Sequence, residues 1–356
     1  ASKARNAVAY LNVDSSTSGP TFEGSAVASL APLLVDVSRT LTTPTGHTLY
    51  DDWRAAKASP TEGSTLPTST TARGRHAVTD EDLVDVRIGS GSDHTVFLNH
   101  LGIPTMGLSF DGPYGVYHSM YDSYFWMNQF GDPGYRYHRL MSQLWGIVGL
   151  RLANAQALPF DMAFYAQSVR AFVDELAKAN RGLAGKVDLR GLTSRLDAFA
   201  TGARRLRTTV DERLTAGTLS SADANAVNRA LMRVERQWLL PDGIPGRPWF
   251  KHSLYAARYT YAHLELPGVT EAVEGRNWVL AADQIAALER AVAGVASSRA
   301  RSRALFRAVE VARQAVAALA DDVQLDVRGT PRDRRPERED VLEHPARRRR
   351  PTPPGV

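Results

Sequence analysis

The stretch AVAYLNVD, residues 7 to 14, is a compact apolar run that ends on a carboxylate. A second run, IPTMGLSF at 103 to 110, has the same character, and both are typical of buried strands. Between them, residues 24 to 41 have apolar side chains at helical spacing, and SDHTVFLNHLG (92 to 102) indicates a short helix. The order strand, helix, helix, strand predicts an α/β domain with a mostly parallel sheet and flanking helices.

From about Asp161 onward the sequence changes to helical periodicity. Apolar side chains recur every three or four positions from Val169 to Leu176 and again from Leu192 to Leu214. The switch is abrupt, so the sequence favours a separate all-α helical bundle over helices that merely cover the α/β part. Further helices are expected over residues 221 to 239 and from 278 toward 320. The predicted domains are residues 1–157, 158–322 and a tail at 323–356.

Composition restricts the class of protein. The chain has 356 residues, of which 43% are hydrophobic and 23% charged, enough for two globular domains. There is no cysteine, which excludes disulfides, thiolate zinc sites and cysteine nucleophiles, so any metal must be held by His, Asp or Glu. We expect no membrane segment, because no apolar run reaches eighteen residues, and residues 1–14 lack the pattern of a secretory signal. Localisation is therefore unknown, with export still open.

The net charge of +5 is concentrated near the end of the chain. Between Arg328 and Arg350, nine arginines face five acidic residues, a net of +4. This proline-rich segment has almost no apolar side chains and is predicted to be disordered. An Arg-rich tail can bind nucleic acid or acidic lipid, but a solvated tail is the commoner outcome, so no nucleic-acid partner is expected.

Three places in the sequence carry possible chemistry. Asp14 ends the first predicted strand, where open parallel sheets gather ligands, although such an Asp more often caps a helix or forms a turn. In IGSGSDHTVFLNHLGIP (88 to 104), the Gly-Ser-Gly run allows close backbone approach, and Asp93 with His94 could belong to a site. The spacing favours Asp93 as a helix cap instead. No Lys-Ser/Thr follows that run, so it is not a phosphate loop.

The third place is GVYHSMYDSY, residues 115 to 124, in which three tyrosines surround His118. Neutral imidazole is a common zinc ligand, and a neighbouring tyrosine hydroxyl can donate to an oxyanion. A lone histidine among aromatic residues is more often structural, and the chain contains no HExxH motif.

Five strings, in this order and spacing, resemble the zinc peptidases that include glutamate carboxypeptidase and the related transferrin receptor. They are AYLNVDSSTSG, IGSGSDHTVFLNHLGIP, VYHSMYDSY, LANAQALPFDMAFYA and GIPGRPWFKHSLYA. The resemblance covers residues 5 to 320, and it corresponds to the C-terminal half of the family: part of the peptidase domain followed by the transferrin-receptor-like dimerisation domain. It implies a peptide substrate, two zinc ions and a homodimer formed through the helical domain.

The resemblance also implies roles for individual residues. Asp14 and His118 would each bind a different zinc ion, and Tyr117 would stabilise the tetrahedral intermediate. The remaining family positions would contact substrate: Ser90, Gly91, Ser92 and Tyr261. Gly107 and Ser109 stand where glutamate carboxypeptidase has two arginines for substrate carboxylates, which argues against selectivity for a C-terminal glutamate.

The family's other zinc ligands and its general base fall before the position of Asp14, so the resemblance predicts an incomplete site. A catalytic zinc needs three protein ligands, and Asp14 and His118 supply one to each ion. We therefore expect this chain to be the C-terminal portion of a zinc exopeptidase that uses a two-zinc-activated water. By itself the chain is expected to be inactive and to bind zinc weakly or not at all. The alternative is a non-catalytic dimerisation or binding protein like the transferrin receptor.

Overall fold

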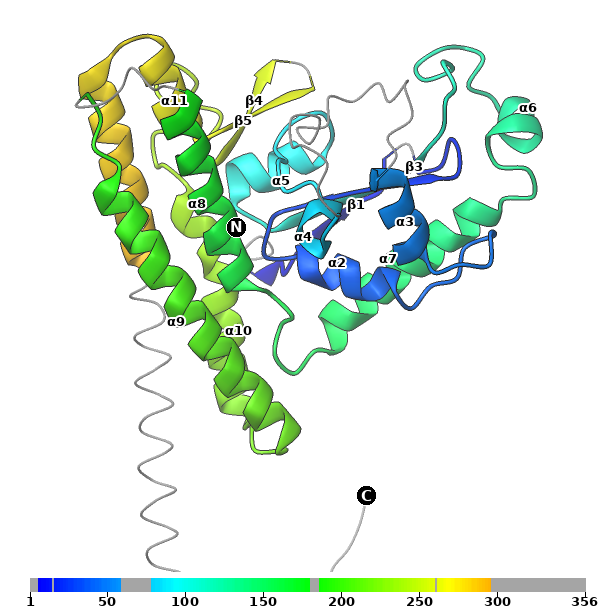
Figure 1. Cartoon of the computed structure of the whole chain (residues 1–356), viewed down its shortest axis with the longest axis horizontal. Coiled ribbons are helices and arrows are strands. Elements are labelled where there is room, and N and C mark those ends of the chain that lie inside the picture. The colour runs from blue at the N-terminus through cyan, green and yellow to red at the C-terminus, as the bar shows by residue number, and fades with distance from the viewer. Residues whose placement is uncertain (1–5, 15, 59–77, 180–185, 260, 296–356) are drawn as a thin grey trace, which may run out of the picture. The chain divides into compact units, whose positions relative to one another are not determined.

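A computed structural model describes residues 6–14, 16–58, 78–179, 186–259 and 261–295 (Figure 1). Its larger sheet has the strand order β1-β3-β2. The three strands are β1 (Tyr10–Asn12), β2 (Thr21–Ala26) and β3 (Thr105–Asp111). β3 is central; it runs parallel to β1, with Asn12 beside Gly107, and antiparallel to β2, with Gly24 beside Leu108. The two strands predicted from apolar runs therefore exist and lie side by side.

Strand β2 corrects the prediction for residues 24 to 41, which were expected to be helical throughout. Residues 24–26 belong to β2, and the helix α2 begins only at Ala31. Along β2 buried and less buried residues alternate, with Phe22, Gly24 and Ala26 facing the core. This period of two is the mark of a half-buried strand. Because β2 is antiparallel to β3, the sheet is mixed rather than mostly parallel.

Helices surround this sheet. They are α2 (Ala31–Ser38), α3 (Leu49–Ala58), α4 (Asp80–Leu83), α5 (His94–Leu101), α6 (Tyr124–Trp126), the π-helix η2 (Met127–Gly131) and α7 (Arg136–Asn154). Met106, Leu108 and Phe110 of β3 are fully buried and belong to one continuous core. α5 ends at Gly102, which adopts the left-handed conformation typical of a helix C-terminus. Asp93 occupies the N-cap position, but its side chain makes no capping hydrogen bond, contrary to the prediction.

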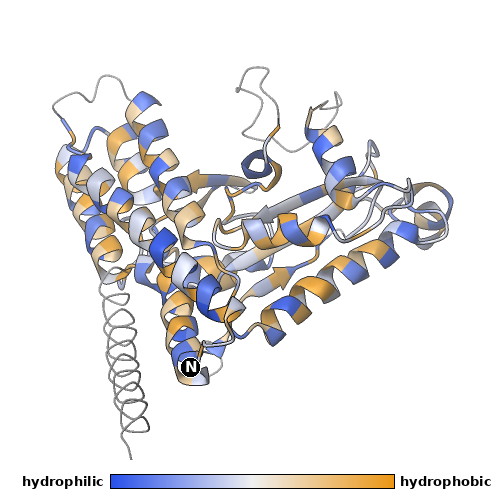
Figure 2. Ribbon diagram, turned by 60° about the horizontal axis from the view of Figure 1, so that its bottom comes forward, coloured by the Kyte–Doolittle hydropathy of each residue, from blue (hydrophilic) through white to orange (hydrophobic). Residues whose placement is uncertain are grey.

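The second half is mainly helical, with α8 (Met162–Ala179), α9 (Arg190–Thr215), α10 (Ser221–Val234), the 3-10 helix η4 (Glu235–Trp238), α11 (Pro267–Glu274) and a helix over residues 278–295. α8 packs along α9. Hydrophobic and hydrophilic residues alternate along these helices in Figure 2, as amphipathic helices require. The rest of the helix expected toward residue 320, and the tail at 323–356, lie outside the described residues.

A hairpin interrupts the helical half, so this half is not all-α. β4 (Tyr255–Tyr259) pairs antiparallel with β5 (Ala262–Glu265). Tyr255 is fully buried, whereas Tyr259 is largely exposed, so the hairpin extends from the core toward the surface. The proposed division at residues 157 and 322 stays a prediction. No helix in the described part of the chain is both long and apolar enough to cross a bilayer.

Candidate functional site

A chain of hydrogen bonds begins at the end of β1. The buried amide of Asn12 donates from Nδ2 to Ser92 Oγ over 3.0 Å. Ser92 in turn donates its hydroxyl proton to Asp14 Oδ2 over 2.6 Å. A serine has a single proton to give, so the proton of Ser92 is committed to Asp14. The arrangement fixes the orientation of the Asp14 carboxylate at the carboxyl end of the strand.

The loop that carries Ser92 depends on two glycines. Gly89 and Gly91 have φ values of 134° and 90°, which glycine adopts readily and other residues rarely do. A Cβ atom on Gly91 would lie 2.9 Å from the ring of Tyr261, so the loop backbone packs directly against the hairpin segment. Ser90 Oγ donates to the carbonyl oxygen of Tyr261 over 2.9 Å. Glycine is thus needed here both for conformation and for close approach.

Tyr117 also contacts this hairpin segment. Its hydroxyl lies 3.1 Å from the hydroxyl of Tyr261. This hydrogen bond to Tyr261, with burial and the nearby charge of Asp14, raises the pKa of Tyr117 to about 12. The Tyr117 phenol therefore keeps its proton at neutral pH and can act as a hydrogen-bond donor.

His118 is exposed and stacks on Tyr117, with ring centroids 3.8 Å apart and an interplanar angle of 19°. Its φ of 57° places it in the left-handed region, which is uncommon for a residue with a side chain. Such a backbone costs of order 1–3 kcal/mol and is frequent at functional sites. The turn thus presents the imidazole beside Tyr117 at an energetic cost.

The structure therefore brings together, from segments far apart in the chain, the seven residues to which the resemblance assigns a role. Asp14 contacts Ser92; Ser90 and Gly91 contact Tyr261; Tyr261 contacts Tyr117; and Tyr117 contacts His118. Their roles in metal binding, catalysis and substrate recognition stay predictions.

These residues do not make a complete zinc site. Within the described parts of the chain, no three His, Asp or Glu side chains come together in a way that could hold a metal ion. Asp14 and His118 have Tyr117 as a common neighbour, but they offer two ligands where a catalytic zinc takes three.

One neighbour of the site was missed by the sequence reasoning, and a second was left without a role. Asn12 could have been found from the spacing Asn-x-Asp, because alternate residues of a strand share one face. His94, at the start of α5, was named together with Asp93 as a possible member of a site, but no role was given to it. Both of its ring nitrogens are buried with no well-formed hydrogen bond among the described residues, although the backbone of Ser90 lies close enough to favour the protonated ring. Burial lowers the pKa of His94 to about 4, against the opposing effect of Asp14 and Asp93, so the ring is neutral.

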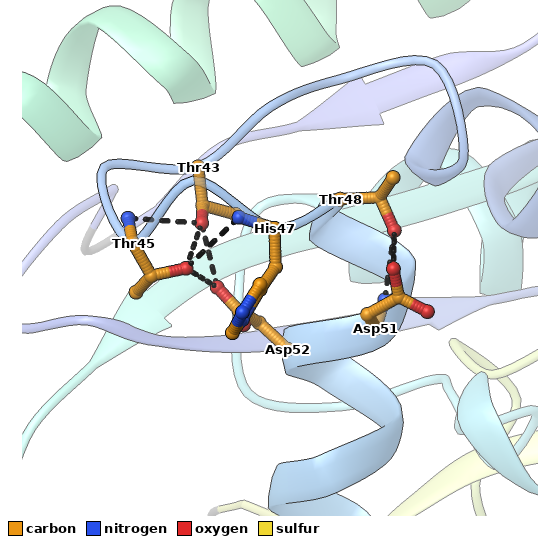
Figure 3. Close-up of polar contacts among 6 residues, drawn as sticks. All are labelled: Thr43, Thr45, His47, Thr48, Asp51 and Asp52. Atoms are coloured by element: carbon orange, nitrogen blue, oxygen red, sulfur yellow. Dashed lines mark hydrogen bonds and ion pairs between the residues drawn. The ribbon is translucent and has the colours of Figure 1, made fainter.

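A second polar cluster lies at the start of α3 (Figure 3). Asp52 Oδ2 accepts from the hydroxyls of Thr43 and Thr45 at 2.6 and 2.8 Å, and Oδ1 lies 3.1 Å from His47 Nδ1. Burial acts to raise the pKa of Asp52, but these hydrogen bonds outweigh it and lower the pKa. Its groups satisfy one another and hold the loop on the helix, so we interpret the cluster as structural.

A third cluster connects the two halves through Arg87. Its guanidinium donates to Glu265 Oε2 on β5 over 2.6 Å and also to Glu175 on α8. It lies over the ring of Phe172, 5.1 Å from the centroid. On the other side of Glu265, His263 Nδ1 lies 2.7 Å from Oε1. Arg87 therefore joins the loop before Gly89 to both the hairpin and α8.

Comparison with known proteins identifies one matching domain and several similar proteins. Residues 187–299 match the transferrin receptor-like dimerisation domain. The chain is 32% identical over 274 residues to the probable glutamate carboxypeptidase LAMP1 of Arabidopsis thaliana, a match that covers 75% of this chain and 36% of that protein.

The chain is related to the glutamate carboxypeptidase family. It is also 26% identical over 284 residues to the aminopeptidase NAALADL1 of Rattus norvegicus, covering 74% of this chain and 35% of that protein. A third relative, from Schizosaccharomyces pombe, is named inactive zinc metalloprotease C354.09c; it is 24% identical over 285 residues, or 75% of this chain and 31% of its own length. The chain thus spans about a third of the length of these relatives. Tyr261 falls inside the matched dimerisation domain, whereas Asp14, Ser92 and Tyr117 precede it.

Proposed function

We propose that this chain forms the substrate-facing wall and the dimer-forming part of a glutamate-carboxypeptidase-like exopeptidase. The observation that supports it is the contact between the hydroxyls of Tyr117 and Tyr261 beside the oriented carboxylate of Asp14. The relatives named as carboxypeptidases and aminopeptidases support a role in peptide hydrolysis. The dimerisation domain supports a homodimer.

The proposed roles follow from the chemistry of each group. The Tyr117 phenol, protonated at neutral pH, would turn from Tyr261 to donate to the oxyanion that develops on the peptide carbonyl. Tyr261 would then close over the substrate's terminal residue, with the glycine backbone of Gly91 beneath it. Asp14 and His118 would each supply one metal ligand. The remaining ligands and the general base would have to come from residues other than those described here.

A chimera tests this proposal. Residues 6–295 would replace the matching part of the Arabidopsis relative, and release of the C-terminal residue from N-acetyl dipeptides would be measured. We expect activity, and we expect Tyr117→Phe to lower kcat by about 10²–10³ with little change in KM, as for loss of one oxyanion donor. Tyr50→Phe, on α3, is the matched control. A folded, dimeric, zinc-loaded chimera that is inactive, or that is indifferent to Tyr117→Phe, would overturn the proposal.

A second candidate function is a non-catalytic dimerisation or binding protein. Two observations favour it. The described residues contain no group of three side chains that could hold a metal ion, and one relative is named an inactive zinc metalloprotease. Both functions expect weak zinc binding by the chain alone, so calorimetric titration of the chain with zinc tests the second function only through a positive result. Binding in the micromolar range or tighter, lost in His118→Ala, would show that the chain assembles a real zinc site and would argue against the non-catalytic reading.

A further inference from the structure

Seven large apolar or aromatic side chains are exposed within seventeen residues that follow β3. They are Tyr114, Tyr117, Met120, Tyr121, Tyr124, Phe125 and Phe130. Fifteen such exposed side chains occur in the whole described part of the chain, so nearly half of them are in this one segment. We call residues 114–131 the aromatic lobe. Apolar side chains that are exposed together in one patch mark a binding surface, whereas single exposed apolar residues are common on any protein.

The aromatic lobe is internally ordered. Tyr114 and Trp126 pack edge to face at 5.2 Å between centroids, which connects its first residue to α6. Phe125 and Phe130 pack edge to face at 6.4 Å. The hydroxyl of Ser123 accepts from the backbone N–H of Trp126 over 3.3 Å and so caps α6. Rings held in this way lose little conformational entropy when they bind a ligand.

The aromatic lobe is continuous with the candidate site, because Tyr117 belongs to both. A peptide placed at Tyr117 and Tyr261 has this surface as its neighbour on the Tyr117 side. The lobe also has little charge: Asp122 is the one Asp, Glu, Lys or Arg between residues 112 and 131. Asp14 lies close to Tyr117 and adds a second acidic side chain at this end of the site. No guanidinium or ammonium group of the lobe is available to bind a substrate carboxylate.

We propose that the aromatic lobe is a recognition surface for aromatic or large aliphatic side chains of the peptide held at Tyr117. The inference rests on the proposed function for the position of the peptide, and it adds the class of substrate: apolar peptides rather than acidic ones. Met120, Tyr121 and Phe125 would cover the substrate side chain, since all three are more than two-thirds exposed. Aromatic pairs add about 0.5–1.5 kcal/mol beyond burial of area, a factor of roughly 2 to 13 in affinity.

Peptide binding to the chain itself tests this inference without any requirement for hydrolysis. Binding of N-acetyl-Phe-Leu and N-acetyl-Asp-Glu would be compared by saturation-transfer NMR and calorimetry. We expect the apolar dipeptide to bind roughly tenfold or more tightly. The double variant Tyr121→Ser, Phe125→Ser removes two exposed rings and should abolish this preference. Val279→Ser, an equally exposed apolar position on the helix at 278–295, should leave it unchanged.

Three outcomes would overturn the inference: equal or tighter binding of the acidic dipeptide, no binding of either up to their solubility limits, or unchanged binding in the double variant. Analytical ultracentrifugation of the same variants measures their oligomeric state and so tests one further outcome. If the double variant only reduces the oligomeric state, a second copy of the chain occupies the lobe and the inference is wrong. Selective binding in the chain together with an inactive chimera would overturn the proposed hydrolysis and leave this recognition surface standing.

Discussion

Ser92 donates a hydrogen bond to Asp14 Oδ2 over 2.6 Å, and its Oγ accepts a hydrogen bond from the side-chain amide of Asn12. The pair joins positions 78 residues apart and sets the direction in which the Asp14 carboxylate faces. Ser92 was predicted to contact substrate; in the structure its proton is already used within the protein. Its contribution to the site therefore lies first in orienting Asp14.

The first prediction concerns the two hydrogen bonds that join Asn12, Ser92 and Asp14. Ser92→Ala leaves the buried Asn12 amide without its acceptor, so the free energy of unfolding should fall by about 1–3 kcal/mol. Ser92→Thr keeps the hydroxyl and should lose much less. Urea denaturation followed by circular dichroism measures both. Ser119→Ala removes an exposed serine hydroxyl and serves as the control. Equal losses for the alanine and threonine variants at position 92 would contradict the role of the hydroxyl.

The second prediction concerns Tyr117. Because the hydrogen bond to Tyr261 is the main cause of its raised pKa, Tyr261→Phe should bring the pKa down from about 12 toward the ordinary value near 10. NMR of the tyrosine Cζ carbons across alkaline pH measures this directly. Tyr121→Phe should leave the titration of Tyr117 unchanged. Titration of Tyr117 near 10 in the unaltered chain would show that the two phenols do not pair in solution.

The third prediction is a pH dependence set by His263. The hydrogen bond from its ring to Glu265 raises the pKa of His263, with Asp85 adding to the effect and burial and Arg87 opposing it. A raised pKa means that protonated His263 stabilises the fold below about 6.5. This contribution is lost as the pH rises through the higher folded-state pKa. The unfolding free energy of the unaltered chain should therefore decline over that range more steeply than that of His263→Gln. Parallel pH profiles would contradict the assignment.

The fourth prediction concerns the cluster on α3. Asp52→Asn removes the ionised acceptor of Thr43, Thr45 and His47, so at neutral pH it should cost about 1–3 kcal/mol of unfolding free energy. Because the pKa of Asp52 is lowered, the difference from the unaltered chain should persist above pH 3.8 and vanish as the pH falls through the folded-state value. Asp51→Asn, whose carboxylate accepts a hydrogen bond from Thr48 and from no other described side chain, is the neighbouring control (Figure 3). Thermal unfolding at several pH values gives the comparison.

Periodicity in the sequence was enough to find the elements with strong patterns. The apolar runs identified β1 and β3, and the spacing of three and four found α8, α9 and α10. β2 was missed because the segment Gly-Ser-Ala-Val-Ala has small and apolar residues that suit a strand or a helix equally well. The hairpin β4–β5 was missed because its strands have five and four residues and lie within a helical region. Local pattern cannot decide such cases, since the packing partner is far away in the sequence.

The candidate site was harder to predict from local sequence patterns than the fold. Asp14, His118 and the Gly-Ser-Gly loop were noticed from their residue types, but only the family resemblance placed them together. The meeting of Tyr117 with Tyr261 spans 144 residues, and no periodicity reports such a contact. His94 was given no role for the same reason: its sequence neighbours do not reveal that its ring is buried.

The position of Tyr261 has a practical consequence for anyone who wishes to divide this protein. Although it lies among residues matched to an assembly module, its backbone and hydroxyl complete the surface built by Ser90 and Tyr117. Cutting the chain at residue 157 would therefore separate Ser90 and Tyr117 from the residue that both of them contact. The first 157 residues and the segment matched to the dimerisation domain share this surface, and neither piece holds all of it.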